Sequence, residues 1–212
     1  GYGEGVDTSA NPALRVFNMV MILFGIGTML YVFSASTAFI VEGELKDIFR
    51  RRKMLKQIRD LKDHFIVCGA GETASHVVQE LLKTGNSFVV IDHDAERLEK
   101  IQHLGGFPVV QGEAAEEEIL ESAGLSRARG LVTALPDDKD NLMVVVTARQ
   151  MSPTLRIVGR CTDARMADKL IRAGANSAVS PNLIGGMRLA SELIRPHVVS
   201  FLDLMLKEES KT

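Results

Sequence analysis

An uncharged, largely apolar run from Val16 to Val41 constrains this chain more than any other feature of its sequence. It holds about 26 positions, and at about 1.5 Å of rise per helical residue it can cross a hydrocarbon core of about 30 Å with some tilt. A cleaved signal peptide is the alternative. Against it, the run is too long, no small-residue cleavage site follows, and the basic residues come after the run instead of before it. We therefore expect one membrane-spanning helix followed by a water-soluble region.

Charged residues on the two sides of this span predict its orientation. Glu4 and Asp7 precede the run, whereas a basic cluster follows it: Arg50, Arg51, Arg52, Lys53 and Lys56. Because basic residues are retained on the cytoplasmic side of membranes, we expect the bulk of the chain to be cytoplasmic and the cluster to lie against lipid headgroups. The formal net charge of -2 gives no support for a nucleic-acid partner.

Metal-binding patterns are absent from the sequence. Cys68 and Cys161 lie far apart in apolar runs, which predicts buried thiols in a reducing compartment. The five histidines have no close-spaced ligand pattern. The acidic residues Asp137, Asp138 and Asp140 are better explained as the solvated start of a helix than as a divalent-ion site.

The chain after the span divides into a charged linker and an α/β region. Residues 42–63 are predicted to form a helical linker, because apolar residues recur there at helical spacing. From His64 onward, short β-rich runs alternate with amphipathic segments, which is typical of a parallel α/β sheet. We thus expect three parts: residues 1–41 with the membrane helix, the linker at 42–63, and a Rossmann-like, doubly wound parallel-sheet domain at 64–212.

Six strands and six helices are expected in the α/β region. The strands are predicted at 65–68, 88–91, 108–110, 130–134, 156–160 and 177–179, and the helices at 72–84, 94–104, 115–123, 138–150, 163–173 and 182–194. Strict alternation favours the strand order 3-2-1-4-5-6, with a ligand crevice at the carboxyl ends of the first and fourth strands.

A glycine-rich loop follows the first predicted strand. Phe65 to Glu72 reads FIVCGAGE, and Gly69-x-Gly71-x-x-Ala74 fits the dinucleotide-binding pattern with alanine as the third small residue. The second strand ends at Asp92, about 23 residues after Gly69, where an acid is expected to bind ribose hydroxyls. The loop is therefore predicted to bind a nucleotide, although a Rossmann scaffold with an empty loop is the alternative.

The acid at Asp92 favours NAD(H), ADP, ATP or AMP over a ligand with a ribose 2'-phosphate. Arg160 is a candidate counter-charge for the phosphates, or else a surface arginine. Glu72 at the mouth of the loop is unexpected for a tight pyrophosphate site. The residues expected to contact the nucleotide are Gly69, Ala70, Gly71, Glu72, Thr73, Asp92, His93, Glu113, Ala114, Ala134 and Arg160.

Several segments of the α/β region resemble the RCK domain, the regulator of potassium conductance, also called the TrkA N-terminal type. They are Gln111 to Ala114, Ala123 to Leu125, Arg129 to Ala134, Ala173 to Ala175 and Val179 to Asn182. The resemblance implies a helix, here Asn182 to Leu206, that crosses to a partner domain in a gating ring. It does not extend to the calcium site of calcium-gated relatives, because Arg160 and Thr162 occupy the positions of the acidic ligands.

The amino-terminal Gly1-Tyr2-Gly3 resembles the end of the potassium-channel selectivity filter TVGYG, which is followed by a pore-lining inner helix. The resemblance implies that the carbonyls of these three residues bind K+ and that Gly25, in a GIG-like segment, is the gating hinge. The Thr-Val half of the filter is not present, and Glu4 stands where many family members have Asp. We therefore expect further sequence before Gly1, and also after Thr212, where an RCK domain usually continues.

Together these features predict a subunit of a homotetrameric, nucleotide-gated potassium channel in a prokaryotic inner membrane, and not an enzyme. Two alternatives remain open. One is a membrane-anchored NAD-dependent oxidoreductase, and the other is a regulatory subunit of a potassium transporter without its own pore.

Overall fold

The computed structural model describes residues 12–41 and 54–194, and in the first segment it describes the side chains of residues 12, 13 and 15–35. The chain divides into two compact units, Gly1–Lys53 and Met54–Thr212. The predicted filter at Gly1 to Gly3 and the basic cluster at 50–53 lie outside the described residues.

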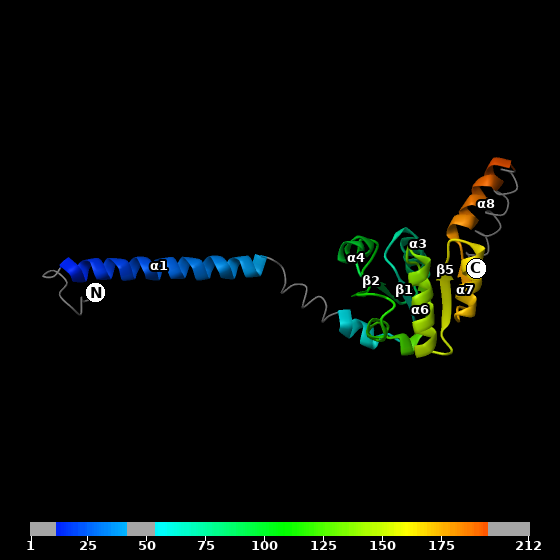
Figure 1. Cartoon of the computed structure of the whole chain (residues 1–212), viewed down its shortest axis with the longest axis horizontal. Helices are drawn as coiled ribbons and strands as arrows, with labels where there is room; N and C mark the ends of the chain where they lie inside the picture. Colours follow the sequence, from blue (N-terminus) through cyan, green and yellow to red (C-terminus); the bar gives the residue numbers. More distant parts are fainter. Residues whose placement is uncertain (1–11, 42–53, 195–212) are drawn as a thin grey trace. The chain divides into compact units, whose positions relative to one another are not determined.

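The first unit contains one long helix, α1 (Pro12–Val41), drawn in blue in Figure 1. Pro12 opens it, as expected for a residue whose ring fixes a helical φ and whose missing N–H is not needed in the first turn. Within α1, Arg15–Ala35 is long and apolar enough to cross a membrane, with a mean hydropathy of 2.1. Its large apolar side chains are exposed on all sides, as a helix surrounded by lipid or by other membrane helices requires.

The second unit is built on a six-stranded parallel sheet in the order β3-β2-β1-β4-β5-β6, which confirms the predicted order. The strands are β1 (His64–Cys68), β2 (Phe88–Asp92), β3 (Val109–Gln111), β4 (Ala128–Thr133), β5 (Arg156–Arg160) and β6 (Ser177–Val179). β1 pairs with both β2 and β4, so the first and fourth strands meet at the centre of the sheet.

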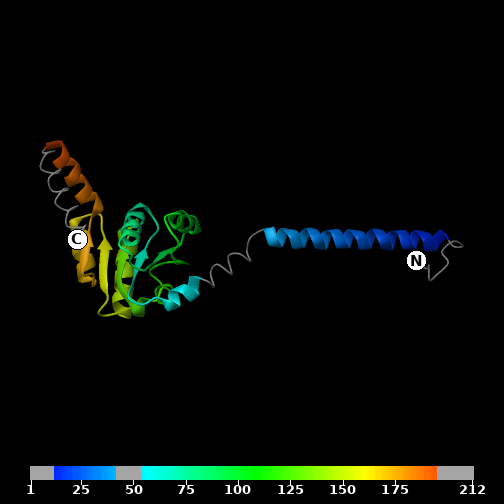
Figure 2. The same ribbon diagram turned by 180° about the vertical axis from the view of Figure 1, so that it is seen from behind.

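Helices cover both faces of this sheet (Figures 1 and 2). The helices of this unit are α3 (Glu72–Lys83), α4 (Ala95–Gln102), α5 (Glu117–Ser122), the short 3-10 helix η1 (Leu125–Arg127), α6 (Asp138–Met151), α7 (Ala164–Arg172) and α8 (Pro181–Ile194), of which α8 extends away from the sheet (Figures 1 and 2). A further helix at residues 54–60 lies within the segment predicted as a linker.

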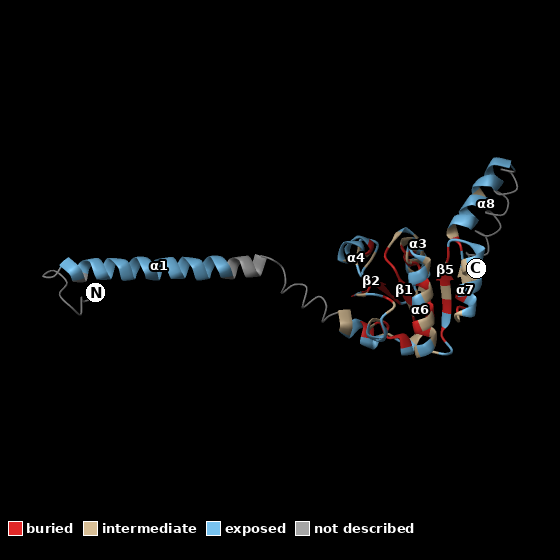
Figure 3. Cartoon of the chain, viewed as in Figure 1, coloured by how far each residue is buried: buried red, intermediate tan, exposed pale blue. Residues whose placement is uncertain are grey.

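The core has two parts because successive strand residues face opposite sides of the sheet. Val67 of β1 packs in a cluster with residues of α3 and α4 such as Val78 and Leu98. Ile66 and Cys68 belong to the other cluster, which includes Leu120, Val144 and Leu170 of α5, α6 and α7. Figure 3 shows these buried strands in red, whereas α8 is pale blue, with none of its residues buried.

Candidate nucleotide site at the carboxyl ends of β1 and β2

The glycine loop is fixed between β2 and β4. The N–H of Gly69 donates to the carbonyl of Ile91 at 2.7 Å, and the N–H of Ala134 donates to the carbonyl of Cys68 at 2.7 Å. Gly69 has φ +111°, and a Cβ at this position would come within 2.9 Å of the Ala134 carbonyl oxygen. Glycine is therefore required here, both for its backbone conformation and for the close approach of the strand-four loop.

The second glycine, Gly71, leaves open space at the start of α3. It is the N-cap of that helix, and a Cβ built on it would meet nothing within 4 Å. The N-caps of α4, α6 and α7 are aspartates whose side chains accept from first-turn N–H groups, whereas Gly71 provides no such acceptor. A helix N-terminus without a side-chain cap, at the positive end of the helix dipole, is suited to a phosphate.

The other loop residues follow from this start of α3. Glu72 is exposed in the first turn, Thr73 is half-buried, and Ala74 is fully buried against the sheet. The small third residue thus lets α3 approach β1 closely, as the fingerprint predicts. The carboxylate of Glu72 is nonetheless at the amino end of α3, where it adds negative charge beside the expected phosphates.

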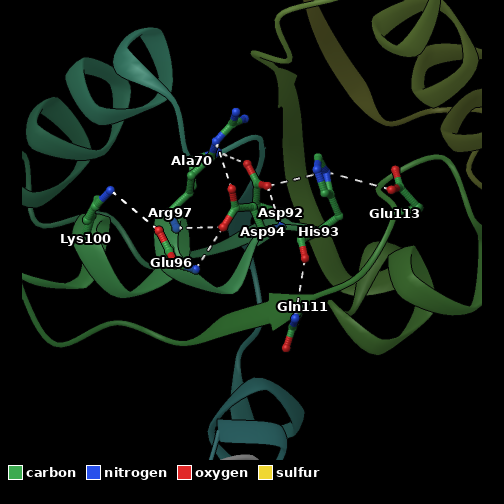
Figure 4. A network of polar contacts seen from close by, with 9 residues as sticks. All are labelled: Ala70, Asp92, His93, Asp94, Glu96, Arg97, Lys100, Gln111 and Glu113. Atoms are coloured by element: carbon green, nitrogen blue, oxygen red, sulfur yellow. Dashed lines mark hydrogen bonds and ion pairs between the residues drawn. The ribbon is translucent and has the colours of Figure 1, made fainter.

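Asp92 connects the end of β2 to the glycine loop. Its side chain is only 2% exposed. Oδ2 accepts from the N–H of Ala70 at 2.7 Å and Oδ1 accepts from the N–H of Asp94 at 2.9 Å (Figure 4). Each carboxylate oxygen keeps a second lone pair for a ribose hydroxyl, but such a contact requires a local shift that exposes the side chain.

His93 and Glu113 lie beside Asp92 at the edge of the site. The His93 Nδ1 atom is 3.6 Å from Asp92 Oδ1 and 3.8 Å from Glu113 Oε1, so the imidazole stands between the two carboxylates (Figure 4). The side chains of His93 and Glu113 are more than half exposed. The Gly112 N–H donates to the Asp92 carbonyl at 3.0 Å, which holds the loop after β3 against the end of β2. The residues that follow β2 and β3 therefore lie side by side at this edge of the sheet.

Ala114, Ala134 and Arg160 occupy different surroundings. Ala114 and Ala134 are 4% and 5% exposed and belong to the two core clusters, so their side chains support the site from beneath. Arg160 donates through Nη1 to the carbonyls of Leu135 and Pro136, in the loop after β4. Its guanidinium thus lies at the carboxyl edge of the sheet, where it stabilises that loop.

Asp94 is a residue of this region that the sequence interpretation did not single out. As N-cap of α4, it accepts hydrogen bonds from the N–H groups of Glu96 and Arg97. The bond from the Arg97 N–H is the main cause that lowers the pKa of its carboxyl, opposed in part by desolvation. An aspartate at the start of the helix predicted at 94–104 was the available signal.

The cysteines are both free and buried, as predicted. Burial raises the pKa of the Cys68 thiol well above its ordinary value. Burial, followed by the carboxylates of Asp138 and Asp163, raises the pKa of Cys161. Neither thiol is therefore a thiolate nucleophile at neutral pH. Among the described residues, no group of three or more His, Cys, Asp or Glu side chains could hold a metal ion.

A parallel sheet in this order, with a glycine loop and an acid at the ends of adjacent strands, defines a Rossmann-like lobe of the nucleotide-binding class. The chain belongs to the TrkA-N domain family, which residues 65–181 match. This finding confirms the predicted RCK-type lobe.

Similarity to known proteins extends through the long apolar helix α1. Probable potassium channel protein 2 of Methanocaldococcus jannaschii is 36% identical over 98% of this chain and 60% of its own length. Potassium channel protein 1 of the same organism is 31% identical over 99% of this chain and 62% of its own length. The chain thus spans about three fifths of these relatives, which are named as channels and not as enzymes.

A solved structure matches the lobe. The Kef carboxyl-terminal domain of Shewanella denitrificans in its AMP-bound form has a TM-score of 0.57 and 26% identity, over 69% of this chain and 92% of that chain.

Proposed function

We propose that this chain is part of a potassium channel subunit whose cytoplasmic lobe binds an adenine nucleotide or NAD(H) and thereby controls the pore. The observation that carries the proposal is the glycine loop at Gly69 to Gly71, joined to the buried carboxylate of Asp92 in a chain that also contains a membrane-length helix. The similarity to two proteins named as potassium channels, over nearly the whole chain, supports the same function.

The site favours a ligand with an adenosine half. The Kef domain similar to this lobe binds AMP, and the open start of α3 is suited to a phosphate next to the glycine loop. The carboxylates of Asp92 and Glu113 border this region, and their charge would repel a 2'-phosphate on the ribose. NAD(H), AMP, ADP and ATP are accordingly the proposed ligands, and NADP is not.

In the proposed assembly, four subunits surround one pore in a prokaryotic inner membrane and four lobes form a ring in the cytoplasm. Gly1, Tyr2 and Gly3 would bind K+ through their carbonyls, and the basic cluster would lie at the lipid headgroups. A ligand acts on such a gate only through its different affinities for the open and closed states. Shifting the gate from 1:99 to 99:1 takes about 5.5 kcal/mol, or about 1.4 kcal/mol for each of four sites, which is roughly tenfold in affinity per site.

Binding and gating are tested separately. The purified protein should unfold at a higher temperature in the presence of AMP, ADP, ATP, NAD+ or NADH. At a ligand concentration 100 times the Kd, binding should raise the free energy of unfolding by about 2.7 kcal/mol. NADP+ should give a smaller shift at the same concentration. The full-length protein in liposomes should pass K+ in preference to Na+, and the nucleotide that binds most tightly should change its open probability.

A protein with no nucleotide-dependent stabilisation, and with currents that ignore every nucleotide tested, would contradict the regulatory role. If the full-length protein binds nucleotide but carries no K+ current, it is a nucleotide-binding module, and the proposal that it forms a K+ pore is contradicted. Hydride transfer from NADH by the full-length protein would favour the oxidoreductase alternative.

A further inference from the structure

Arg127, at the end of η1, holds the last turn of the helix at 54–60 against the lobe. Its Nε donates to the carbonyl of Leu61 at 3.3 Å, and its Nη2 donates to the carbonyl of Ile58 at 3.3 Å. The carbonyls at the end of a helix carry the negative end of its dipole, and the Ile58 carbonyl also accepts from the N–H of Leu61 at 3.1 Å. A guanidinium, which is planar, charged and carries several donors, is well suited to bind two of them at once.

The main chain of Arg127 holds the same segment. Its carbonyl accepts from the N–H of Asp63 at 3.0 Å. Asp63 has φ +55°, the one positive φ outside glycine among the described residues, and it turns the chain from this helix into β1. Ile58 is 1% exposed and belongs to the same core cluster as Leu125 of η1. The end of the predicted linker is thus packed into the lobe and bonded to one residue.

Gly124 provides the space that this arrangement needs. It has φ +79°, and a Cβ there would lie 2.8 Å from Arg127 Nη2 and 3.2 Å from His64 Cε1. His64 is fully buried, and its Nε2 lies 2.9 Å from the carbonyl oxygen of Ala123. Any side chain at position 124 would therefore collide with the guanidinium of Arg127, which is itself exposed.

Arg127 is also connected to the nucleotide site through two elements. It directly precedes β4, whose carboxyl end leads to Ala134 and its contact with Gly69. On its other side, η1 follows α5, and Ile119 of α5 packs against Gly112, next to Glu113. A packed strand and a packed helix thus join the two borders of the site to the residue that bonds the linker.

From these contacts, we infer that Arg127 is the positioning residue that couples the lobe to the membrane helix. It makes the end of the linker move with η1 when nucleotide binding rearranges the site. This inference rests on the proposed function, because it requires a pore that responds to nucleotide. The Arg127 side chain has no part in binding the nucleotide itself.

The experiment compares R127Q with the matched control R129Q in the full-length protein. Arg129 lies two residues away on β4, over the ring of Phe65 at 5.7 Å, and makes no described contact with the linker. R127Q should keep the single-channel conductance and a nucleotide Kd within about twofold of wild type. The nucleotide-dependent change in its open probability should be smaller than that of wild type by a factor of at least about five, which is the scale of a typical coupling between sites. R129Q should respond as wild type does.

Hydrogen exchange supplies a readout that does not depend on currents. Amides at 54–63 should exchange faster in R127Q than in wild type or R129Q, while amides of β1 and α3 stay protected. If R127Q does not fold, R127K keeps the charge without the guanidinium fork and should show the same loss of gating in part.

A full nucleotide response in R127Q, or unchanged exchange at 54–63, would overturn the inference and leave the proposed function standing. A wild-type channel that ignores nucleotide would overturn the proposed function and the inference with it.

Discussion

Asp92 accepts a hydrogen bond from the main-chain N–H of Ala70 at 2.7 Å, across 22 residues of sequence. The acid expected to bind a ribose is therefore also a structural support for the phosphate loop. Since its other oxygen accepts from the Asp94 N–H, this one carboxylate fixes both the loop after β1 and the start of α4. A variant at this position should change the shape of the site as well as its affinity.

Replacing Asp92 by asparagine should weaken both folding and nucleotide binding. The amide presents an NH2 group to one of two N–H donors, which leaves a buried donor unsatisfied at a cost of about 1–3 kcal/mol. We expect that loss in the free energy of unfolding at pH 7, measured with urea, and at least about a tenfold rise in the nucleotide Kd.

The control for this change is D94N, the same substitution two residues further on. Asparagine is as good an N-cap as aspartate, so D94N should keep a nucleotide Kd within about twofold of wild type. Wild-type affinity in D92N would show that Asp92 does not take part in the site.

The order of the strands could be predicted from the sequence, because strict alternation of strand and helix with right-handed crossovers leaves few arrangements of a parallel sheet. The positions of Gly69, Gly71 and Asp92 followed from the same pattern. The two glycines meet a backbone requirement and Asp92 ends a strand, and either kind of position can be recognised from its residue type.

Contacts between side chains and distant carbonyls could not be predicted in this way. Arg127 stands in an ordinary polar stretch, and its partners at Ile58 and Leu61 are main-chain oxygens, which every residue type provides. The direction of a side chain is equally hidden: Ala114 is predicted to contact the nucleotide, and its side chain packs in the core. A position next to a motif does not show which way its side chain faces.

Gly25 tests the proposed gating hinge in α1. A Cβ there would meet nothing within 4 Å among the described residues, so alanine adds no clash within the chain. It does stabilise a straight helix by about 1 kcal/mol relative to glycine. G25A should therefore shift the equilibrium between the bent and the straight helix by roughly fivefold per subunit toward the straight helix, and single-channel recordings should show this as a changed open probability. G27A has the same open surroundings and should change gating little, and equal effects of the two variants would contradict a hinge at Gly25.

Asp94 predicts a loss of stability in acid. Hydrogen bonds from the Arg97 and Glu96 N–H groups lower the pKa of its carboxyl in the folded state. The unfolded state then takes up the proton first, so this stabilisation is present above the ordinary aspartate pKa of about 3.9 and is lost as the pH falls through the lower folded pKa. Urea unfolding between about pH 2.5 and 6 should show a steeper acid loss for wild type than for D94N. Parallel pH profiles would contradict the role of this cap.

The two glycines of the loop should respond differently to alanine. G69A forces a side chain into a positive φ and within 2.9 Å of the Ala134 carbonyl oxygen, so it should cost about 1–3 kcal/mol of unfolding free energy. G71A meets open space, and its ordinary φ of -79° suits alanine. It should cost at most about 1 kcal/mol as a poorer N-cap.

Because the methyl group of G71A would stand where the phosphate is expected, its nucleotide Kd should still rise at least about tenfold. Calorimetric titration with AMP and NADH, beside urea unfolding of both variants, separates the two effects. If G71A bound nucleotide as tightly as wild type, the phosphate could not lie against the start of α3.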